Sequence, residues 1–192
     1  YTLHTLFPYT TLFRSPNPLS YLSWEADALP APPSLLSADP STALHPSFNP
    51  SLPLIDPSNA ILLPFPDLIP YLEFVLARLS LPLLARTDFL AYWLPALLQI
   101  HGRGEQIALR FVEQELYGAS ARLDVEPVPD IVTRVFMLFR GVDESELPDW
   151  EEARERVESV DWAKVVGVRE EAMDENKFRV LEWGGMEALY YW

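Results

Sequence analysis

Charged side chains occur within segments that otherwise have the composition of β-strands, and these residues are the best placed for chemistry. They are Glu25, Arg110, Arg134, Arg140, Arg179 and Glu182. A charge on a half-buried sheet face must be paired with an opposite charge. These residues therefore predict a structural network of Arg–Glu pairs or an exposed sheet face, with a polar patch that binds a ligand as the alternative.

Aromatic residues supply the second part of a candidate ligand site. A binding pocket combines apolar walls with a few convergent polar groups. The ligand-binding candidates are Trp24, Glu25, Tyr92, Trp93, Arg134, Glu182 and Trp183. The ligand interpretation predicts that Arg134, Glu182 and Trp183 converge in one concave pocket. The same aromatic residues are also typical of a hydrophobic core.

The sequence contains none of the patterns that identify catalytic or metal-binding residues. It has no cysteine, which excludes disulfides, thiolate nucleophiles and cysteine-based zinc sites. His45 and His101 lack the i, i+4 spacing of a metal site. There is no G-x-S-x-G, S-x-x-K or P-loop sequence. We therefore predict no catalytic residues, no metal and no cofactor.

Hydrophobic spacing predicts a pair of helices that would position the aromatic candidates. The first follows Asp67, the expected N-cap, with Leu68, Leu72, Val75, Leu76 and Leu79 at helical spacing. The second is predicted over Leu83–Leu94. Pro95 cannot donate to the helical ladder, so the helix should end or kink there, with a further turn to Ile100 as the alternative. Two helices joined by so short a connection should pack as a hairpin.

After the hairpin the hydrophobic period changes to the two-residue period of strands. Strands are predicted at Tyr21–Glu25, Gln106–Phe111, Ile131–Val142 and Lys177–Trp183, with Trp162–Val168 compatible with another. The apolar character of both faces of Ile131–Val142 places that strand centrally in the sheet. Gly184 and Gly185 are predicted to form a hairpin turn. Short helices are expected at Glu113–Gly118 and around Asp149–Ser159.

These elements predict an α+β fold, a mostly antiparallel sheet of about five strands with a helical hairpin packed on one face. Residues 16–26 supply the first strand, residues 27–60 a Pro-rich irregular loop, and residues 61–189 the remainder of one globular domain. Proline prevents a helix or central strand in the loop. Pro-rich segments also bind SH3-type and WW modules, but no Arg or Lys flanks a PxxP motif here, so an insertion under little constraint is favoured.

The leader Thr5–Ser15, TLFPYTTLFRS, resembles a translation of the common adapter ligated to DNA fragments before short-read sequencing. Codons of that adapter account for every residue of the stretch. We therefore exclude residues 1–15 from the fold as a non-native artefact. We expect the native product to begin upstream of Pro16, so that any targeting signal lies outside this sequence.

Net charge argues against several classes of partner. The formal net charge is -14, and the segment from Asp143 to Asp161 is rich in acids. Such a field repels nucleic acid and anionic membrane surfaces. No apolar run approaches the roughly 20 residues of a membrane span. The absence of cysteine fits a reducing compartment, and we expect a cytoplasmic location.

Several motifs in order along the chain resemble a family of predicted proteins of unknown function from fungi and bacteria. They are YLSWEA, DFLAYWLP, PDIVTRVFMLFRGV and FRVLEWGGME, and the resemblance covers Tyr21 to Glu187. The most specific pieces are Asp88–Pro95 and Pro129–Met137. The resemblance implies a genuine domain but no activity, cofactor or catalytic residue.

Two functions remain open at this point. The lack of a catalytic constellation favours a non-enzymatic interaction or structural domain, with an unknown protein as a possible partner. The alternative is a small-ligand binder or unrecognised enzyme that uses the Arg/Glu/Trp sheet face.

Overall fold

A computed structural model describes residues 48–188 of the chain. The strands are β1 (Ile61–Leu63), β2 (Gln106–Phe111), β3 (Ile131–Val142) and β4 (Arg179–Glu187). The helices are α2 (Phe65–Arg78), α3 (Leu83–Gly102), α4 (Gln114–Ser120), α5 (Glu151–Glu155) and α6 (Trp162–Val166), with 3-10 turns η2 (Leu147–Trp150), η3 (Arg156–Glu158) and η4 (Glu170–Met173). The adapter-like leader, the predicted strand Tyr21–Glu25 and most of the Pro-rich loop lie outside the described residues.

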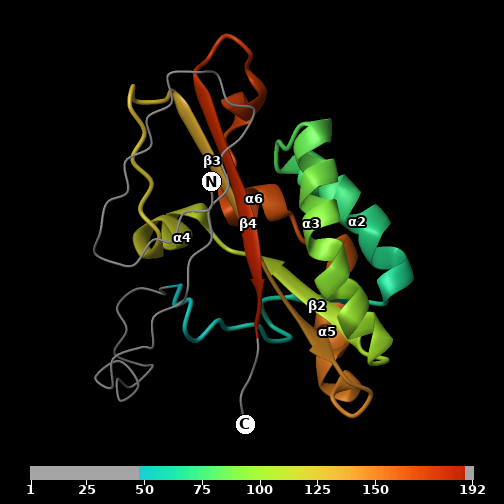
Figure 1. Ribbon diagram of the computed structural model, residues 1–192. Coiled ribbons are helices and arrows are strands. Elements are labelled where there is room, and N and C mark those ends of the chain that lie inside the picture. The colour runs from blue at the N-terminus through green and yellow to red at the C-terminus, as the bar shows by residue number, and fades with distance from the viewer. Residues whose placement is uncertain (1–47, 189–192) are drawn as a thin grey trace, which may run out of the picture. The chain divides into compact units, whose positions relative to one another are not determined.

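The sheet combines both strand directions. Its order is β1-β2-β3-β4, and the first two pairings are antiparallel while β3 and β4 are parallel. The α+β class and the central place of β3 are confirmed. The prediction of about five mostly antiparallel strands is only roughly met, because the described residues form four strands in a mixed sheet. Residues 143–178 return the chain to the starting end of β3, as a parallel pairing requires (Figure 1).

The α2–α3 hairpin was predicted correctly, but its limits differ. Helix α2 begins at Phe65, with Pro64 as its N-cap and Asp67 inside the first turn. Helix α3 does not end at Leu94, because it continues through Pro95 and the further turn to Ile100 and ends at Gly102. One missing backbone hydrogen bond does not end this helix, because the next turns bury Leu97 and Ile100 in the core.

The segment Trp162–Val168 forms helix α6 and not a strand. The Asp161 side chain accepts a hydrogen bond from the backbone N–H of Lys164 at 3.4 Å, which caps the first turn. Gly167 ends the helix with φ of 82°, the left-handed conformation that glycine adopts without strain. This spacing buries Trp162 and Val166 together on one helical face.

Gly184 and Gly185 lie inside β4 and do not form the predicted hairpin turn. In the parallel register they lie opposite Phe136 and Met137, and the strand continues to Glu187. The second glycine is required by close packing. A Cβ atom on Gly185 would lie 2.6 Å from the Met137 carbonyl oxygen and 3.2 Å from Cζ2 of Trp93 on α3. Gly185 therefore marks a close approach between β4, β3 and helix α3.

The expected helix over Asp149–Ser159 is divided. Its middle forms α5, and 3-10 turns flank it on both sides. The predicted apolar stripe is present, since Trp150 and Ala153 are buried and Val157 is partly buried.

The two faces of the sheet carry separate hydrophobic clusters. Val135, Met137 and Phe139 of β3 pack with the α2–α3 hairpin and α6. Leu138 and Val142 face the other way, with α4 and α5. Figure 1 shows the hairpin on one side of the sheet and α4 on the other. No helix in the described part of the chain is long and apolar enough to cross a membrane.

Candidate functional site

The structure joins two of the predicted site residues in an ion pair. Arg134 and Glu182 lie directly opposite each other in the parallel register of β3 and β4. The Nε atom of Arg134 donates to the Oε2 atom of Glu182. Their side chains are 8% and 13% exposed, so the pair is nearly removed from water. An ion pair this deeply buried stabilises the fold only if hydrogen bonds satisfy its remaining polar atoms.

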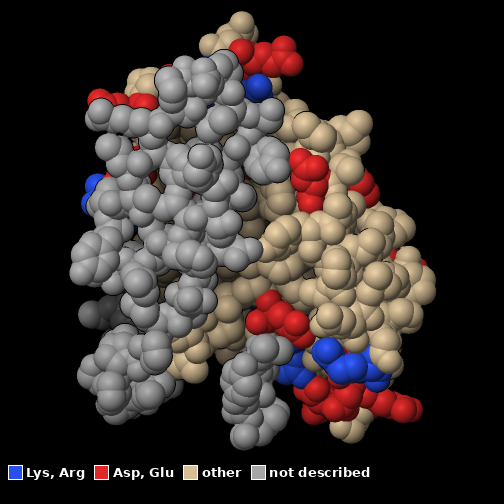
Figure 2. Space-filling model, viewed as in Figure 1, with Lys and Arg blue, Asp and Glu red and all other residues tan. Residues whose placement is uncertain are grey.

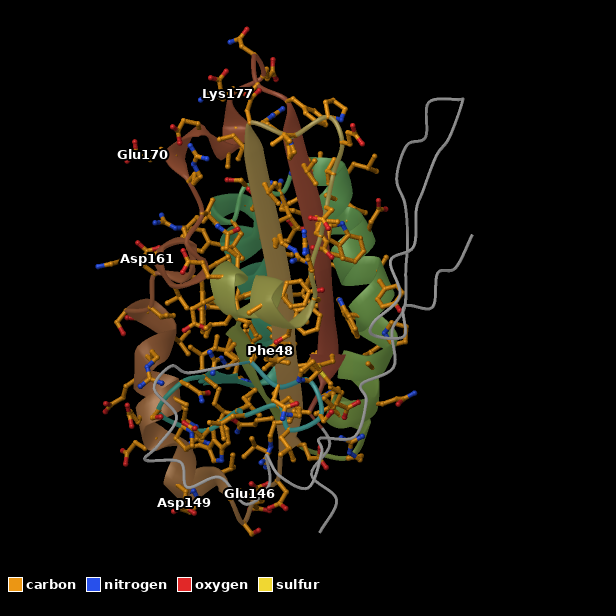
Figure 3. All side chains as sticks on the ribbon, turned by 90° about the vertical axis from the view of Figure 1, so that its left-hand side faces the viewer. Phe48, Glu146, Asp149, Asp161, Glu170 and Lys177 are labelled. Atoms are coloured by element: carbon orange, nitrogen blue, oxygen red, sulfur yellow. The ribbon has the colours of Figure 1, made fainter. Side chains whose placement is uncertain are left out.

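Helix α4 supplies most of those contacts. The Nη1 atom of Arg134 donates to the carbonyl oxygen of Ala121 at 2.5 Å, and the guanidinium lies 4.4 Å from the ring centroid of Tyr117. The side chain of Gln114 accepts from the backbone N–H of Arg134 at 3.2 Å. Figure 3 looks onto this face, with Phe48 beside α4. The guanidinium thus ties α4 to the sheet.

One polar atom of the pair is left over. The Oε1 atom of Glu182 is buried and has no hydrogen-bond partner. Glu182 does not line the groove beside α2 or the hollow beside β1 and η3. The arrangement fits an internal ion pair that fastens α4 to β3 and β4.

The predicted aromatic residues lie on the opposite face of the sheet. Trp183 packs 5.4 Å from Phe89 and 6.3 Å from Tyr92, measured between ring centroids. Trp93 packs 5.4 Å from Phe139. Successive residues of a strand point to opposite faces, so Glu182 and Trp183 are separated by the sheet. The remaining candidates, Trp24 and Glu25, lie outside the described residues.

The other strand arginines also have local partners, although the buried Nε atom of Arg110 has no hydrogen-bond acceptor. Arg110 pairs with Glu113 at 3.1 Å, and Arg140 pairs with Glu146. Arg179 donates to the carbonyl oxygen of Ala172 at 3.1 Å. Within residues 48–188, no group of three His, Asp or Glu side chains is arranged to hold a metal ion.

The burial of Tyr117 beside this ion pair predicts how the free energy of unfolding changes at alkaline pH. Burial raises the pKa of Tyr117 above its usual value, and the Glu182 carboxylate raises it further. A group whose pKa is raised in the folded state contributes stability to the fold. That contribution is fully present at pH values below the unfolded-state pKa, and it is lost as pH rises through the folded-state pKa. We therefore expect the free energy of unfolding to fall above about pH 10, and to fall less steeply in Tyr117→Phe.

Urea denaturation across that pH range measures both slopes. Burial raises the pKa of Tyr71 as well, so a residual slope should remain in the variant. Equal slopes for wild type and Tyr117→Phe would contradict the assignment.

An apolar groove of about 330 Å³ lies between α2 and the segment from η3 to α6. Its walls include Tyr71, Phe74 and Trp162. The Trp162 indole N–H donates to the Tyr71 hydroxyl at 2.8 Å, so the polar groups there join α6 to α2. No local motif indicates this groove, because its walls come from segments about 90 residues apart in the chain.

A second feature is an apolar stripe on the outer surface of α3. It consists of Leu84, Ala91, Pro95 and Leu98, all exposed to solvent. Leu84 is 71% exposed and Leu98 is 45% exposed. The flanking residues Leu83 and Tyr92 are exposed as well. We refer to Leu84, Ala91, Pro95 and Leu98 as the α3 stripe.

Charged side chains are sparse around the α3 stripe. Asp88 is the acid of α3, and Arg86 is turned toward Glu73 of α2 at 3.2 Å. Figure 2 shows a broad surface over the α2–α3 hairpin with few charged side chains. Large exposed apolar patches on a soluble domain mark interaction surfaces.

The sequence of α3 itself contains a signal for this stripe. An amphipathic surface helix alternates an apolar face with a polar one. In α3 the buried face holds Phe89, Leu97 and Ile100, while the exposed face combines the four apolar residues of the stripe with polar Thr87, Asp88 and Gln99. Two exposed leucines on that face depart from the polar outer face expected of an amphipathic surface helix.

Comparison with known proteins adds no assignment to this geometry. No protein-family model, no curated protein and no solved structure matches the chain. The resemblance to a family of fungal and bacterial proteins therefore stays a prediction.

Proposed function

We propose that this domain is a non-enzymatic interaction module that binds another protein chain through the α3 stripe. The observation that carries the proposal is a 20-residue helix with apolar side chains on its exposed face. Leaving Leu84 and Leu98 in water forgoes roughly 25 cal/mol for each Å² of apolar surface that a partner would cover. A partner helix or sheet face would recover that free energy.

The polar residues support the same proposal. Chemistry at an active site requires acid, base or nucleophile groups that converge on open space. Arg134 and Glu182 are instead buried against each other, and Arg140 is engaged by Glu146. These groups serve to hold elements of the fold together.

Site-specific photo-crosslinking tests the proposal. Benzoylphenylalanine is placed at position 84 or 98 of the full chain in cells that express it, and at position 77 as the control. Ala77 is exposed on α2 and does not belong to the α3 stripe. We expect a defined protein adduct, identified by mass spectrometry, from positions 84 and 98 and none from position 77. Adducts that are absent, or equal at all three positions, would contradict the proposal.

A small-molecule site at the Arg/Glu/Trp sheet face has weaker support. The unpartnered Oε1 atom of Glu182 favours it, since a ligand donor would satisfy that oxygen. Against it, Trp183 lies on the other face of the sheet and packs onto Phe89. The convergence that a ligand pocket needs is therefore missing among these residues.

A further inference from the structure

We infer that Tyr21–Glu25 is a further strand of this sheet, paired antiparallel with the open edge of β4 so that Ser23 lies opposite Glu182. The segment lies outside the described residues, so its place is argued from β4 itself. Three observations carry the inference: the open edge of β4, the unpartnered carboxylate oxygen of Glu182 and the glycine pair. The inference does not depend on the α3 stripe or on its partner.

The outer edge of β4 has free backbone hydrogen-bonding groups. Among the described residues, no strand pairs with this side of β4, the last strand of the sheet (Figure 1). In a parallel pairing, alternate residues direct both the N–H and the C=O to one neighbour. The N–H of Ala188 donates to the carbonyl oxygen of Phe139 at 2.8 Å, so the even-numbered residues of β4 face β3. The backbone groups that point to the open edge are those of Leu181, Trp183 and Gly185.

This edge also lacks the features that protect an exposed strand. Native proteins shorten such edges, cover them or protect them with lysine or proline, because a long apolar edge is a template for aggregation. β4 has nine residues, none of them lysine or proline, and every residue is at least partly exposed. The opposite edge strand, β1, has three residues, and Arg156 of η3 donates beside it to the carbonyl oxygen of Ala60 at 3.0 Å. The edge of β4 is therefore the place where an added strand completes the sheet.

Tyr21–Glu25 has the apolar alternation that fits the α3 side of this edge. Leu22 and Trp24 share one face of the segment. In the proposed register Leu22 lies opposite Trp183 and Trp24 lies opposite Leu181. Trp183 and Leu181 pack against the hydrophobic cluster beneath the α2–α3 hairpin, and both are only partly buried. The added strand extends that cluster over them.

The other face of the segment supplies a donor to the buried ion pair. The Oε2 atom of Glu182 accepts from Arg134, while the Oε1 atom is buried without a partner among the described residues. Residues directly opposite in an antiparallel pair have Cβ atoms about 4.5–5.5 Å apart. The Ser23 hydroxyl is therefore within reach of Oε1 and donates to it. This hydrogen bond removes the desolvation cost of a buried acceptor that is left unpaired.

The glycine pair selects the antiparallel direction. That direction places Tyr21 opposite Gly184, and aromatic side chains cover edge glycines in this way. It also places Glu25 opposite Val180, near the exposed first residue of β4. The parallel direction would instead set the Glu25 carboxylate against Gly184 and the ring of Phe136, which is an apolar surrounding for a charge.

The chain is long enough to bring the segment to this edge. Residues 26–47 join Glu25 to Phe48, and an extended chain of this length spans about 70 Å. Phe48 packs 6.2 Å from Tyr117 of α4, measured between ring centroids, and Figure 3 shows it beside that helix. A nine-residue strand such as β4 is about 30 Å long. The connection therefore allows either direction, and the side chains decide between them.

Disulfide trapping in the full chain tests the pairing and its direction. The chain has no cysteine, so each double variant contains a single pair of thiols. In the proposed register Glu25 lies directly opposite Val180, at a separation that a disulfide can bridge. Glu25→Cys with Val180→Cys should therefore form an intramolecular disulfide in native buffer with oxidised glutathione. Peptide mass spectrometry without reduction detects it.

Glu25→Cys with Gly184→Cys is the matched control, because it moves the second thiol along the same face of β4. Gly184 accepts a Cβ atom at an ordinary contact distance. In the antiparallel register this pair is separated by roughly 13 Å along the strand. Its disulfide should form at least about tenfold more slowly, because that separation exceeds the span of a disulfide. Equal rates, or a faster control, overturn the antiparallel register. No disulfide in either variant overturns the pairing itself.

Amide hydrogen exchange gives a second readout that needs no cysteine. The N–H groups of Leu181 and Trp183 should be protected in the full chain, as β2 is. Leu22→Asp should raise their exchange rates at least about tenfold, because it sets a charge against Trp183. Leu12→Asp is the matched control in the leader and should leave them unchanged. Protection of β2 in both variants shows that the domain remains folded. Unprotected β4 amides in the wild type, or equal rates in both variants, would contradict the inference.

Discussion

Replacing Arg134 by alanine should lower the free energy of unfolding by about 3–5 kcal/mol, the cost typical of breaking a buried ion pair. The variant leaves the Glu182 carboxylate between β4 and α4 with no cation, and its Oε1 atom is already unpartnered. It also frees the carbonyl oxygen of Ala121 at the end of α4. Urea denaturation at neutral pH measures the change.

The double variant Arg134→Met with Glu182→Leu separates the buried charge from the packing. Replacing both partners with apolar residues of similar volume is often neutral or stabilising. We expect it to be more stable than Arg134→Ala, because it removes the unpaired carboxylate. An exposed pair serves as the control. Arg122 and Asp124 are 80% and 66% exposed, so Arg122→Ala should change stability by less than about 1 kcal/mol. Equal losses for Arg134→Ala and Arg122→Ala would refute the structural role.

Replacing Gly185 by alanine should lower the free energy of unfolding by about 3 kcal/mol, near the upper end of the usual overpacking range. The new methyl group would lie 2.6 Å from the Met137 carbonyl oxygen, a backbone atom held by the sheet. On its other side, Trp93 is fixed against Phe139. Neither neighbour can move without disturbing β3 or α3.

The adjacent glycine is a matched control for that substitution. A Cβ atom on Gly184 would lie 3.4 Å from Cδ2 of Phe136, an ordinary van der Waals contact. Gly184→Ala should therefore be close to neutral, since alanine also reduces the entropy of the unfolded chain. Thermal or chemical denaturation of both variants makes the comparison. A similar loss in both would show that neither the close approach nor Trp93 matters.

Local periodicity was sufficient to predict those elements whose residue pattern is set within one segment of the chain. The limits of β2 and β3 follow from alternating apolar residues, and both strands have the predicted bounds. The α2–α3 hairpin follows from helical spacing and a short connection. Local sequence did not decide between an end and a continuation at Pro95, and the helix continues because burial of Leu97 and Ile100 outweighs one lost hydrogen bond.

The candidate site depended on contacts between segments that lie far apart in the chain. Alternation within β4 already separates Glu182 from Trp183, once that segment is a strand. Which residue faces Glu182 depends on the register of two strands 48 residues apart. Likewise, the glycine pair resembles a turn until Trp93 of α3 is known to pack against Gly185.

By itself, the sequence determined the α+β class, the central strand, the helical hairpin and the absence of cysteine chemistry. These properties follow from residue types and short-range spacing. Only the tertiary structure decided that Arg134 pairs with Glu182, that Gly185 accommodates Trp93 and that α3 exposes an apolar face. The physical reason is that pairing and exposure depend on which segments pack together, and packing joins residues that lie far apart in the chain.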